Sequence, residues 1–311
     1  MKAQYKILDL RNRPPLPPYK AIFDLKLNLL NKPLKRELGV MWFRWLSKTV
    51  LPLRINRGAA TVTPSMRMVG HPEAMTQWWR EIDEAGIDAV VANGRLTEDR
   101  GSITAEALAD LQKQYSQRFY GLAPVDLEKE PAQSAADCER AVRELGLRGA
   151  NIEPGLRKRG SGATHVDHPD LYPIYETMSA LDAPVMVYNS AFAAPKQPYL
   201  VNEAPPYDRV LGKFPKLKII LGHGGYPCVK QILELAPRRP NLFICQDIYT
   251  FWPGGRLYQR QIDRLQDQFI FGTSYPFSSM AEPIEQTLRF KLSRAAMEKY
   301  LWGNGARLLR L

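Results

Sequence analysis

The sequence predicts an α/β protein with the (β/α)8 TIM-barrel fold. Short apolar runs alternate along the chain with longer stretches of helical spacing, which is the pattern of repeated βαβ units. Most of these runs are apolar almost throughout, as are strands that are covered on both faces. The expected strands are residues 5–10, 87–93, 118–126, 148–154, 183–189, 217–223, 241–247 and 268–274.

The helices between the strands carry recognisable start and stop signals. Residues 72–85 begin at Pro72 and end at Gly86, and residues 137–145 end at Gly146 in the same way. Proline is common in the first turn of a helix, and glycine is common just after its end. Ser293 is expected to cap a closing helix. We therefore expect residues 1–311 to form one barrel domain.

Two insertions interrupt this alternation, and both follow the carboxyl end of a strand. Residues 14–71 separate the first strand from its helix, and residues 155–169 form a glycine-rich loop after the fourth strand. Barrels place their active sites on this side. Within 20–57, an apolar helical face is expected from the spacing of Leu38, Met41, Trp42 and Trp45. This basic helical segment is therefore expected to be a lid or a subunit interface.

Charge and cysteine content exclude several classes of protein. Residues 1–57 hold 13 Lys and Arg against 3 Asp and Glu, and the remaining chain is nearly neutral. No nucleic-acid-binding module accompanies this basic segment, so we expect no nucleic-acid partner. The three cysteines show no paired spacing, which favours a reducing cytoplasm. No secretory signal is visible, and the apolar stretch 38–46 is too short for a membrane span.

Polar side chains stand at the predicted ends of all eight strands. A strand that is apolar for five residues gains no stability from ending on a charge, so turn chemistry alone does not explain the pattern. We expect these side chains to meet at the barrel mouth and to include the functional residues. They are Asp9, Arg11, Arg13, Asn93, Asp126, Glu153, Tyr188, Asn189, His223, Asp247 and Ser274.

Each candidate also has a structural interpretation. His223 could be a core histidine bonded to its glycine-rich turn, and Asp247 could cap the next helix. Glu153 could bind the nearby Arg157 or Arg159, and the loop residue His165 could be merely solvated.

The alternation along the first strand points both Arg11 and Arg13 into the barrel. They could form salt bridges with Glu153 or Asp247, or they could hold the carboxylate of a substrate. The sequence leaves both readings open.

Four segments resemble the amidohydrolase-related family, which contains metal-dependent hydrolases and non-oxidative decarboxylases. IILGHGGYP at 219–227 is similar to the motif of the family's sixth strand, and FGTSYPF at 271–277 to that of its eighth. MEKYLWGNGARLL at 297–309 is similar to the closing helix, and KILDLRNRPP lies near the start. The resemblance spans nearly the full length and implies a metal-dependent barrel enzyme.

The sequence departs from the family at most of the usual metal ligands. The family begins Asp-x-His-x-His, whereas this chain has Arg11 and Arg13 at the two histidine positions. Tyr188 stands where a histidine ligand is usual, and Ser274 stands where an aspartate is usual; His223 is retained.

The resemblance to a divergent branch of the superfamily suggests a different ligand set. The ligands in this set are Glu153, His165, His223 and Asp247. Two carboxylates with two imidazoles suit zinc, manganese or iron.

These observations support a first hypothesis of a metal-dependent hydrolase that acts on a small, anionic organic substrate. A metal-activated water would attack, Asp247 or Glu153 would accept its proton, and His165 would assist. Substrate binding is assigned to Arg11, Arg13, Tyr188 and Ser274.

Two alternatives remain. One is a metal-dependent oxygenase or decarboxylase on the same barrel, because the fold does not fix the reaction. The other is a non-catalytic, degenerate subunit that docks on a related barrel through residues 20–57. The expected partners are a small-molecule substrate and a homo-oligomer or a hetero-oligomer with such a barrel.

Overall fold

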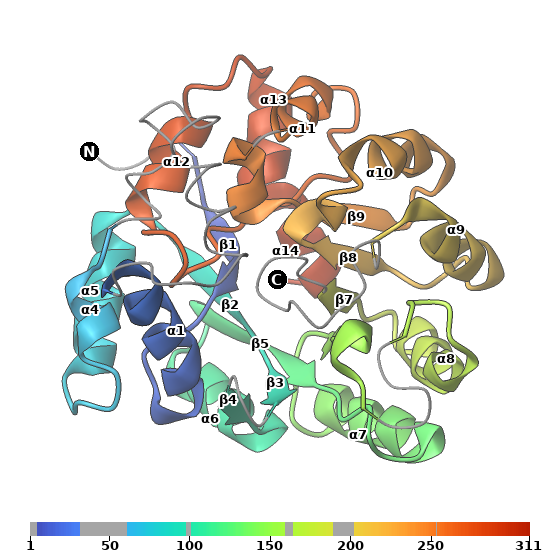
Figure 1. Cartoon of the computed structure of the whole chain (residues 1–311), viewed down its shortest axis with the longest axis horizontal. Coiled ribbons are helices and arrows are strands. Elements are labelled where there is room, and N and C mark those ends of the chain that lie inside the picture. The colour runs from blue at the N-terminus through green and yellow to red at the C-terminus, as the bar shows by residue number, and fades with distance from the viewer. Residues whose placement is uncertain (1–4, 32–60, 98–100, 159–163, 189–201, 253) are drawn as a thin grey trace.

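The computed structural model describes residues 5–31, 61–97, 101–158, 164–188, 202–252 and 254–311. Seven parallel strands form one curled sheet in the order β1-β2-β5-β6-β7-β8-β9. In Figure 1 these strands surround the centre of the molecule, where α14 is seen, and the other helices lie outside them. The strands are β1 Leu8–Asn12, β2 Ala89–Asn93, β5 Phe119–Pro124, β6 Ala150–Ile152, β7 Val185–Tyr188, β8 Ile219–Gly222 and β9 Leu242–Cys245.

The eighth expected strand closes the ring with only a few hydrogen bonds. Ile244 N donates to Gln268 O at 2.7 Å, and Ile270 N donates to Ile244 O at 3.0 Å. On the other side, Leu10 N donates to Phe271 O at 3.2 Å. This segment therefore joins β9 to β1, which confirms the predicted barrel, although it makes an isolated bridge rather than a regular strand.

One pair of strands was not expected. β3 Arg95–Thr97 and β4 Gly101–Ile103 form a short antiparallel pair directly after β2. The predicted eight runs are long, regular and apolar, whereas this pair has three residues in each strand and gives almost no periodic signal.

Helices cover the outside of the ring, as βαβ topology requires. Ser293 caps α13 by accepting a hydrogen bond from Ala296 N at 3.2 Å. Gly86 and Gly146 have φ of +74° and +70°, the left-handed conformation expected after a helix end. The helices are α1 Lys20–Asn31, α4 Pro64–Arg67, α5 Ala74–Glu84, α6 Ala105–Gln114, α7 Pro131–Arg143, α8 Tyr172–Ala180, α9 Ala204–Lys213, α10 Val229–Leu235, α11 Arg256–Gln261, α12 Ala281–Thr287, α13 Arg294–Glu298 and α14 Asn304–Leu309, with a π-helical turn at Lys299–Gly303.

The barrel interior is filled from one end. Leu8, Met186 and Ile220 point inward and pack with Leu308 and Leu309 of α14. A larger apolar cluster lies between the strands and the surrounding helices. The interior packing and α14 leave the opposite end of the barrel, where the strands terminate, for the polar side chains.

The described part of the 14–71 insertion packs on the barrel. The Phe23 ring of α1 lies 5.8 Å from the Tyr275 ring, and Ser65 of α4 donates from Oγ to Glu81 Oε2 at 2.6 Å. The expected helical face at 38–45 lies outside the described residues. Among the helices that are described, none is long and apolar enough to cross a membrane.

Candidate active site

The backbone is strained at three strand ends on the barrel mouth. His223 follows β8, Asp247 follows β9 and Ser274 follows the eighth position, and their φ angles are +61°, +42° and +63°. Each such non-glycine residue costs on the order of 1–3 kcal/mol, and this kind of strain concentrates at functional sites. The strain therefore marks this rim as the candidate site.

A buried cluster of charged side chains lies at the centre of this rim. Asp247 Oδ2 is 2.8 Å from His223 Nδ1 and 3.0 Å from Arg11 Nη1. Both contacts have ion-pair distances but lack the alignment of hydrogen bonds, and the side chains of Arg11 and Asp247 are fully buried. Burial disfavours the charged form of Arg11, yet Tyr188 and Asp247 raise its pKa above the usual value. The carboxylate thus stabilises the positive charge of Arg11.

Tyr188, at the end of β7, is the point at which the basic side chains converge. The guanidinium carbons of Arg11, Arg95 and Arg13 lie 4.1, 5.2 and 5.7 Å from the centre of its ring. The His223 ring centre is 4.4 Å away. Burial by itself raises the pKa of Tyr188, but the surrounding positive charges, Arg11 first, outweigh burial and lower that pKa to about 6. Tyr188 is therefore ionised in this site at neutral pH.

Arg13 differs from the other two arginines because it has no carboxylate partner among the described residues. Its Nε and Nη1 are buried and donate no hydrogen bond to a described residue, and the residue is only 2% exposed. Arg11 Nε and Nη2 and Ser274 Oγ are buried without partners too. A buried donor without an acceptor is costly, so this group indicates a place for an anionic ligand.

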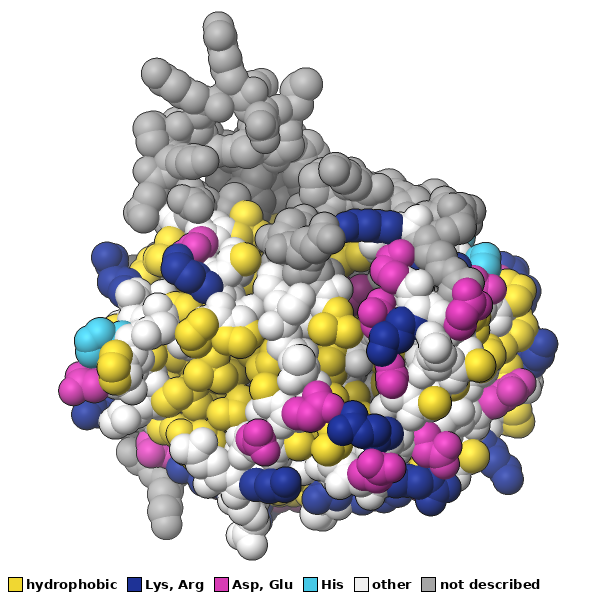
Figure 2. Space-filling model, turned by 90° about the horizontal axis from the view of Figure 1, so that it is seen from below, with side chains coloured by type: hydrophobic (Ala, Val, Ile, Leu, Met, Phe, Trp, Pro, Cys, Tyr) yellow, Lys and Arg dark blue, Asp and Glu magenta, His cyan; other side chains and the backbone are white. Residues whose placement is uncertain are grey.

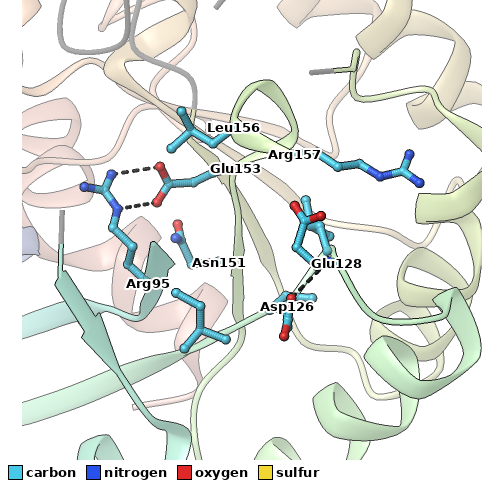
Figure 3. A pocket seen from close by; sticks show the side chains of 10 residues that line it. Arg95, Asp126, Glu128, Asn151, Glu153, Leu156 and Arg157 are labelled. Carbon is cyan, nitrogen blue, oxygen red and sulfur yellow. Dashed lines mark hydrogen bonds and ion pairs between the residues drawn. The ribbon is translucent and has the colours of Figure 1, made fainter. Parts of the chain in front are cut away.

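A surface pocket adjoins the cluster through Arg95 and Glu153. Arg95 forms a two-pronged ion pair with Glu153, at 2.5 Å from Nε to Oε1 and 2.8 Å from Nη2 to Oε2. Figure 3 shows this fork beside Asn151, with Asp126 and Glu128 across the pocket. Asn151 Oδ1 is buried and has no partner. Arg95 therefore faces both the pocket and the Tyr188 ring.

Aromatic side chains form one wall of the site next to His223. The Tyr249 ring lies 4.8 Å from the His223 ring and stacks on Tyr226 at 4.6 Å and 20°. Trp252 continues the wall at 5.1 Å from Tyr249. Such a wall favours ligands with a flat, apolar part.

The structure brings together only part of the predicted ligand set. His223 and Asp247 are in contact, but Glu153 is held by Arg95 instead of by Arg157, which pairs with Asp170. Among the described residues, His165 makes no ion pair or hydrogen bond with the other three, and its Nδ1 is buried without a partner. In the part of the chain that the structure describes, no three His, Cys, Asp or Glu side chains are grouped as a metal site.

The four predicted ligands therefore do not come together, and the reason is that their negative charges are already paired with arginines. Each carboxylate of the set already faces a guanidinium: Asp247 faces Arg11 and Glu153 faces Arg95. These described residues do not fit a divalent metal, and they fit an anion better.

The sequence did not identify Arg95 as a site residue. It follows the Asn93-Gly94 turn rather than ending a strand, and β3 carries it back over the mouth. Its only signal was a charge directly after a turn on the functional side of the barrel.

The sequence model of the Amidohydrolase family matches residues 72–311, so the chain belongs to the amidohydrolase family of enzymes. Gamma-resorcylate decarboxylase from Polaromonas sp. strain JS666 is 24% identical over 296 residues, which covers 75% of this chain and 86% of that protein. An uncharacterized TIM-barrel protein from Bordetella bronchiseptica has a TM-score of 0.79 and 27% identity, with 98% of each chain covered.

A third similar structure is a dihydroxybenzoic acid decarboxylase from Polaromonas sp. JS666, with bound manganese and the inhibitor 2-nitroresorcinol. Its TM-score is 0.66 at 18% identity, and 99% of this chain and 98% of that chain are covered. The family and the TIM-barrel fold predicted from sequence are thus confirmed. The gamma-resorcylate relative is a decarboxylase, which fits the alternative reaction better than the hydrolase.

Proposed function

We propose that this chain is a decarboxylase of a hydroxylated aromatic carboxylate. One observation carries the proposal: three buried guanidiniums converge on Tyr188 next to a His223–Asp247 pair. The name of the gamma-resorcylate relative supports this class of substrate and reaction.

The arginines supply the anion-binding part of the site. Arg11 and Arg13 together present five buried N–H-bearing nitrogens without hydrogen-bond partners among the described residues, where Arg13 has no carboxylate partner either. Charged donors of this kind favour carboxylate and phenolate oxygens, which an ortho-hydroxybenzoate offers side by side. The wall formed by Tyr226, Tyr249 and Trp252 then suits its ring.

His223 is the proposed proton donor. Asp247 Oδ2 lies 2.8 Å from Nδ1 of this imidazole and orients the ring, which leaves Nε2 to deliver the proton. The proton bonds to the ring carbon that carries the carboxylate. The bond from that carbon to the carboxylate then breaks, its electrons return to the ring, and CO2 leaves. The substrate carboxylate and one proton thus become the phenol and CO2.

The arginines also favour this step electronically. A guanidinium beside the phenol oxygen favours its ionised form, and a phenolate pushes electron density onto the neighbouring ring carbon, the one that accepts the proton. Fixed charges that need no rearrangement during the reaction are the most effective kind of stabilisation.

The test is a turnover assay with gamma-resorcylate and other hydroxybenzoates, in which benzoate is the control without a hydroxyl group. We expect CO2 release that His223→Asn lowers by at least ~10²-fold in kcat, the usual contribution of a general acid. His71→Asn, an exposed histidine outside the site, is the matched control and is expected to keep full activity.

Two outcomes would overturn the proposal. Equal activity of His223→Asn and His71→Asn would remove the assigned proton donor. Binding without turnover across the whole panel would instead favour the degenerate, non-catalytic subunit.

A further inference from the structure

Both carboxylates of the predicted ligand set already face an arginine, and Asp247 Oδ1 is buried without a hydrogen-bond partner among the described residues. Asp247 lies 3.0 Å from Arg11, Glu153 is held by Arg95 through two contacts, and the Tyr188 ring is surrounded by all three arginines. A divalent ion bound to either carboxylate would therefore lie within a few ångströms of a positively charged guanidinium that is packed in place.

Packing keeps Arg11 where it is. A Cβ added to Gly272 would come within 2.9 Å of Arg11 Cβ and Cγ, and one added to Gly222 would come within 3.2 Å of Arg11 Nη1. Gly222 ends β8 and Gly272 lies in the eighth barrel segment, on the other side of β9, so the barrel wall lacks side chains at both places where the arginine passes. Arg11 is fully buried as a result, and it cannot swing away into solvent to admit a cation.

We propose that Arg11, supported by Arg13, provides the fixed positive charge of this centre, and that the chain works without a resident divalent metal. This departs from the similar decarboxylase structure that has bound manganese. The inference concerns the charge of the site, so it holds for any anionic substrate and does not depend on the proposed reaction.

The first measurement is the metal content and manganese binding of the protein purified without chelators. We expect far less than one equivalent of any transition metal by mass spectrometry, and no manganese binding at the site by calorimetry or by electron paramagnetic resonance of free Mn²⁺. One retained equivalent that Asp247→Asn removes would overturn the proposal.

The second measurement tests whether manganese is excluded by the positive charge of Arg11 or by a lack of suitable ligands. Arg11→Met removes the charge and frees Asp247 and His223, whereas Arg11→Lys keeps the charge. Manganese affinity is expected to rise at least roughly tenfold in Arg11→Met, because a like charge close to the ion is removed, and to stay unmeasurable in Arg11→Lys. Equal manganese affinities in the two variants would show that the charge of Arg11 is not what excludes the metal.

Arg13 provides the same comparison without the risk of misfolding. Arg13 has no carboxylate partner in the described chain, so Arg13→Met leaves no buried carboxylate unpaired. We expect Arg13→Met to bind manganese more tightly than Arg13→Lys does. The opposite order would overturn the inference even if Arg11→Met did not fold.

Discussion

At the scale of single residues, Arg11 and Arg13 look equivalent in the sequence but have different partners. Arg11 pairs with the fully buried Asp247, whereas Arg13 has no carboxylate among the described residues. A buried carboxylate that loses its partner is expensive. The two arginines should therefore respond differently to the same substitution.

Arg11→Met is expected to lower the free energy of unfolding by about 3–5 kcal/mol, because Asp247 keeps only His223 beside it. Arg13→Met should leave that free energy unchanged or raise it, since burying an unpaired guanidinium is itself unfavourable. Urea denaturation of both variants measures the difference. Equal losses would show that Arg13 has a structural partner as well.

The pH dependence of Tyr188 follows from its pKa of about 6. Because this folded-state pKa is below the ordinary value, the group stabilises the folded protein fully above the unfolded pKa. That contribution is lost as the pH falls through about 6. Tyrosinate absorbance near 295 nm should titrate at about pH 6 and be missing in Tyr188→Phe.

Binding of an anion should reverse this ionisation. The ligand would share the positive charge of Arg11 and Arg13, so Tyr188 would take up a proton. The tyrosinate signal at neutral pH should therefore decrease as a hydroxybenzoate binds. A signal that persists at saturation would place the ligand away from the three arginines.

The sequence predicted that polar side chains at the ends of buried strands would lie together, because parallel strands end at one rim. His223, Asp247, Tyr188 and Arg11 do lie together, and their role as site residues stays a prediction. The pairing of charges was not predictable, because Glu153 and Arg95 are 58 positions apart and meet only through the turn after β2.

At the scale of elements, β1 is tied to the eighth position of the barrel by a single carboxylate. Asp9 Oδ1 accepts from Thr273 N at 2.8 Å and from Arg11 N at 3.0 Å. Asp9 Oδ2 accepts from Thr273 Oγ1 at 2.6 Å and from Asn12 Nδ2 at 2.8 Å. These bonds matter because the last segment has few ladder bonds of its own.

Asp9→Asn is expected to destabilise the protein by about 1–3 kcal/mol. The substitution replaces one of the two accepting oxygens by an NH2 group, which cannot accept, so a buried donor loses its partner. Thermal unfolding measures the loss. Asp24→Asn, at a half-exposed site on α1, is the matched control with little expected effect. Equal stability of the two variants would mean that this carboxylate does not hold the barrel closed.

Strands and helix ends were predictable because their signals are local. Apolar runs located all eight barrel positions, and Gly86 and Gly146 marked the ends of α5 and α7. The β3–β4 pair could not be foreseen, since three-residue strands carry no usable period. α7 begins at Pro131 rather than at 137, because its first turn has no apolar face to reveal it.

At the scale of the whole molecule, charge is distributed unevenly along the chain. Residues 1–57 hold 13 basic and 3 acidic side chains. By contrast, one face of the barrel shows acidic and basic side chains intermixed around a hydrophobic area (Figure 2). Mixed surfaces of this kind are ordinary for a soluble domain, so the basic segment is the unusual feature.

The predicted role of that segment lies outside the described residues and stays a prediction. The spacing of Leu38, Met41, Trp42 and Trp45 predicts one helical face, and a face with two tryptophans is expected to be buried against another surface. The segment follows β1 and so starts on the mouth side of the barrel. We favour a second subunit as the surface that covers this face.

Replacing both tryptophans, Trp42→Ala with Trp45→Ala, should therefore lower the molar mass measured by light scattering. Leu288→Ala is the control: it removes an apolar side chain that is 41% exposed in the described part of the chain, and it should leave the mass unchanged. An unchanged mass with weaker hydroxybenzoate binding would identify the segment as a lid over the mouth, because only a lid couples those tryptophans to the substrate without joining two chains.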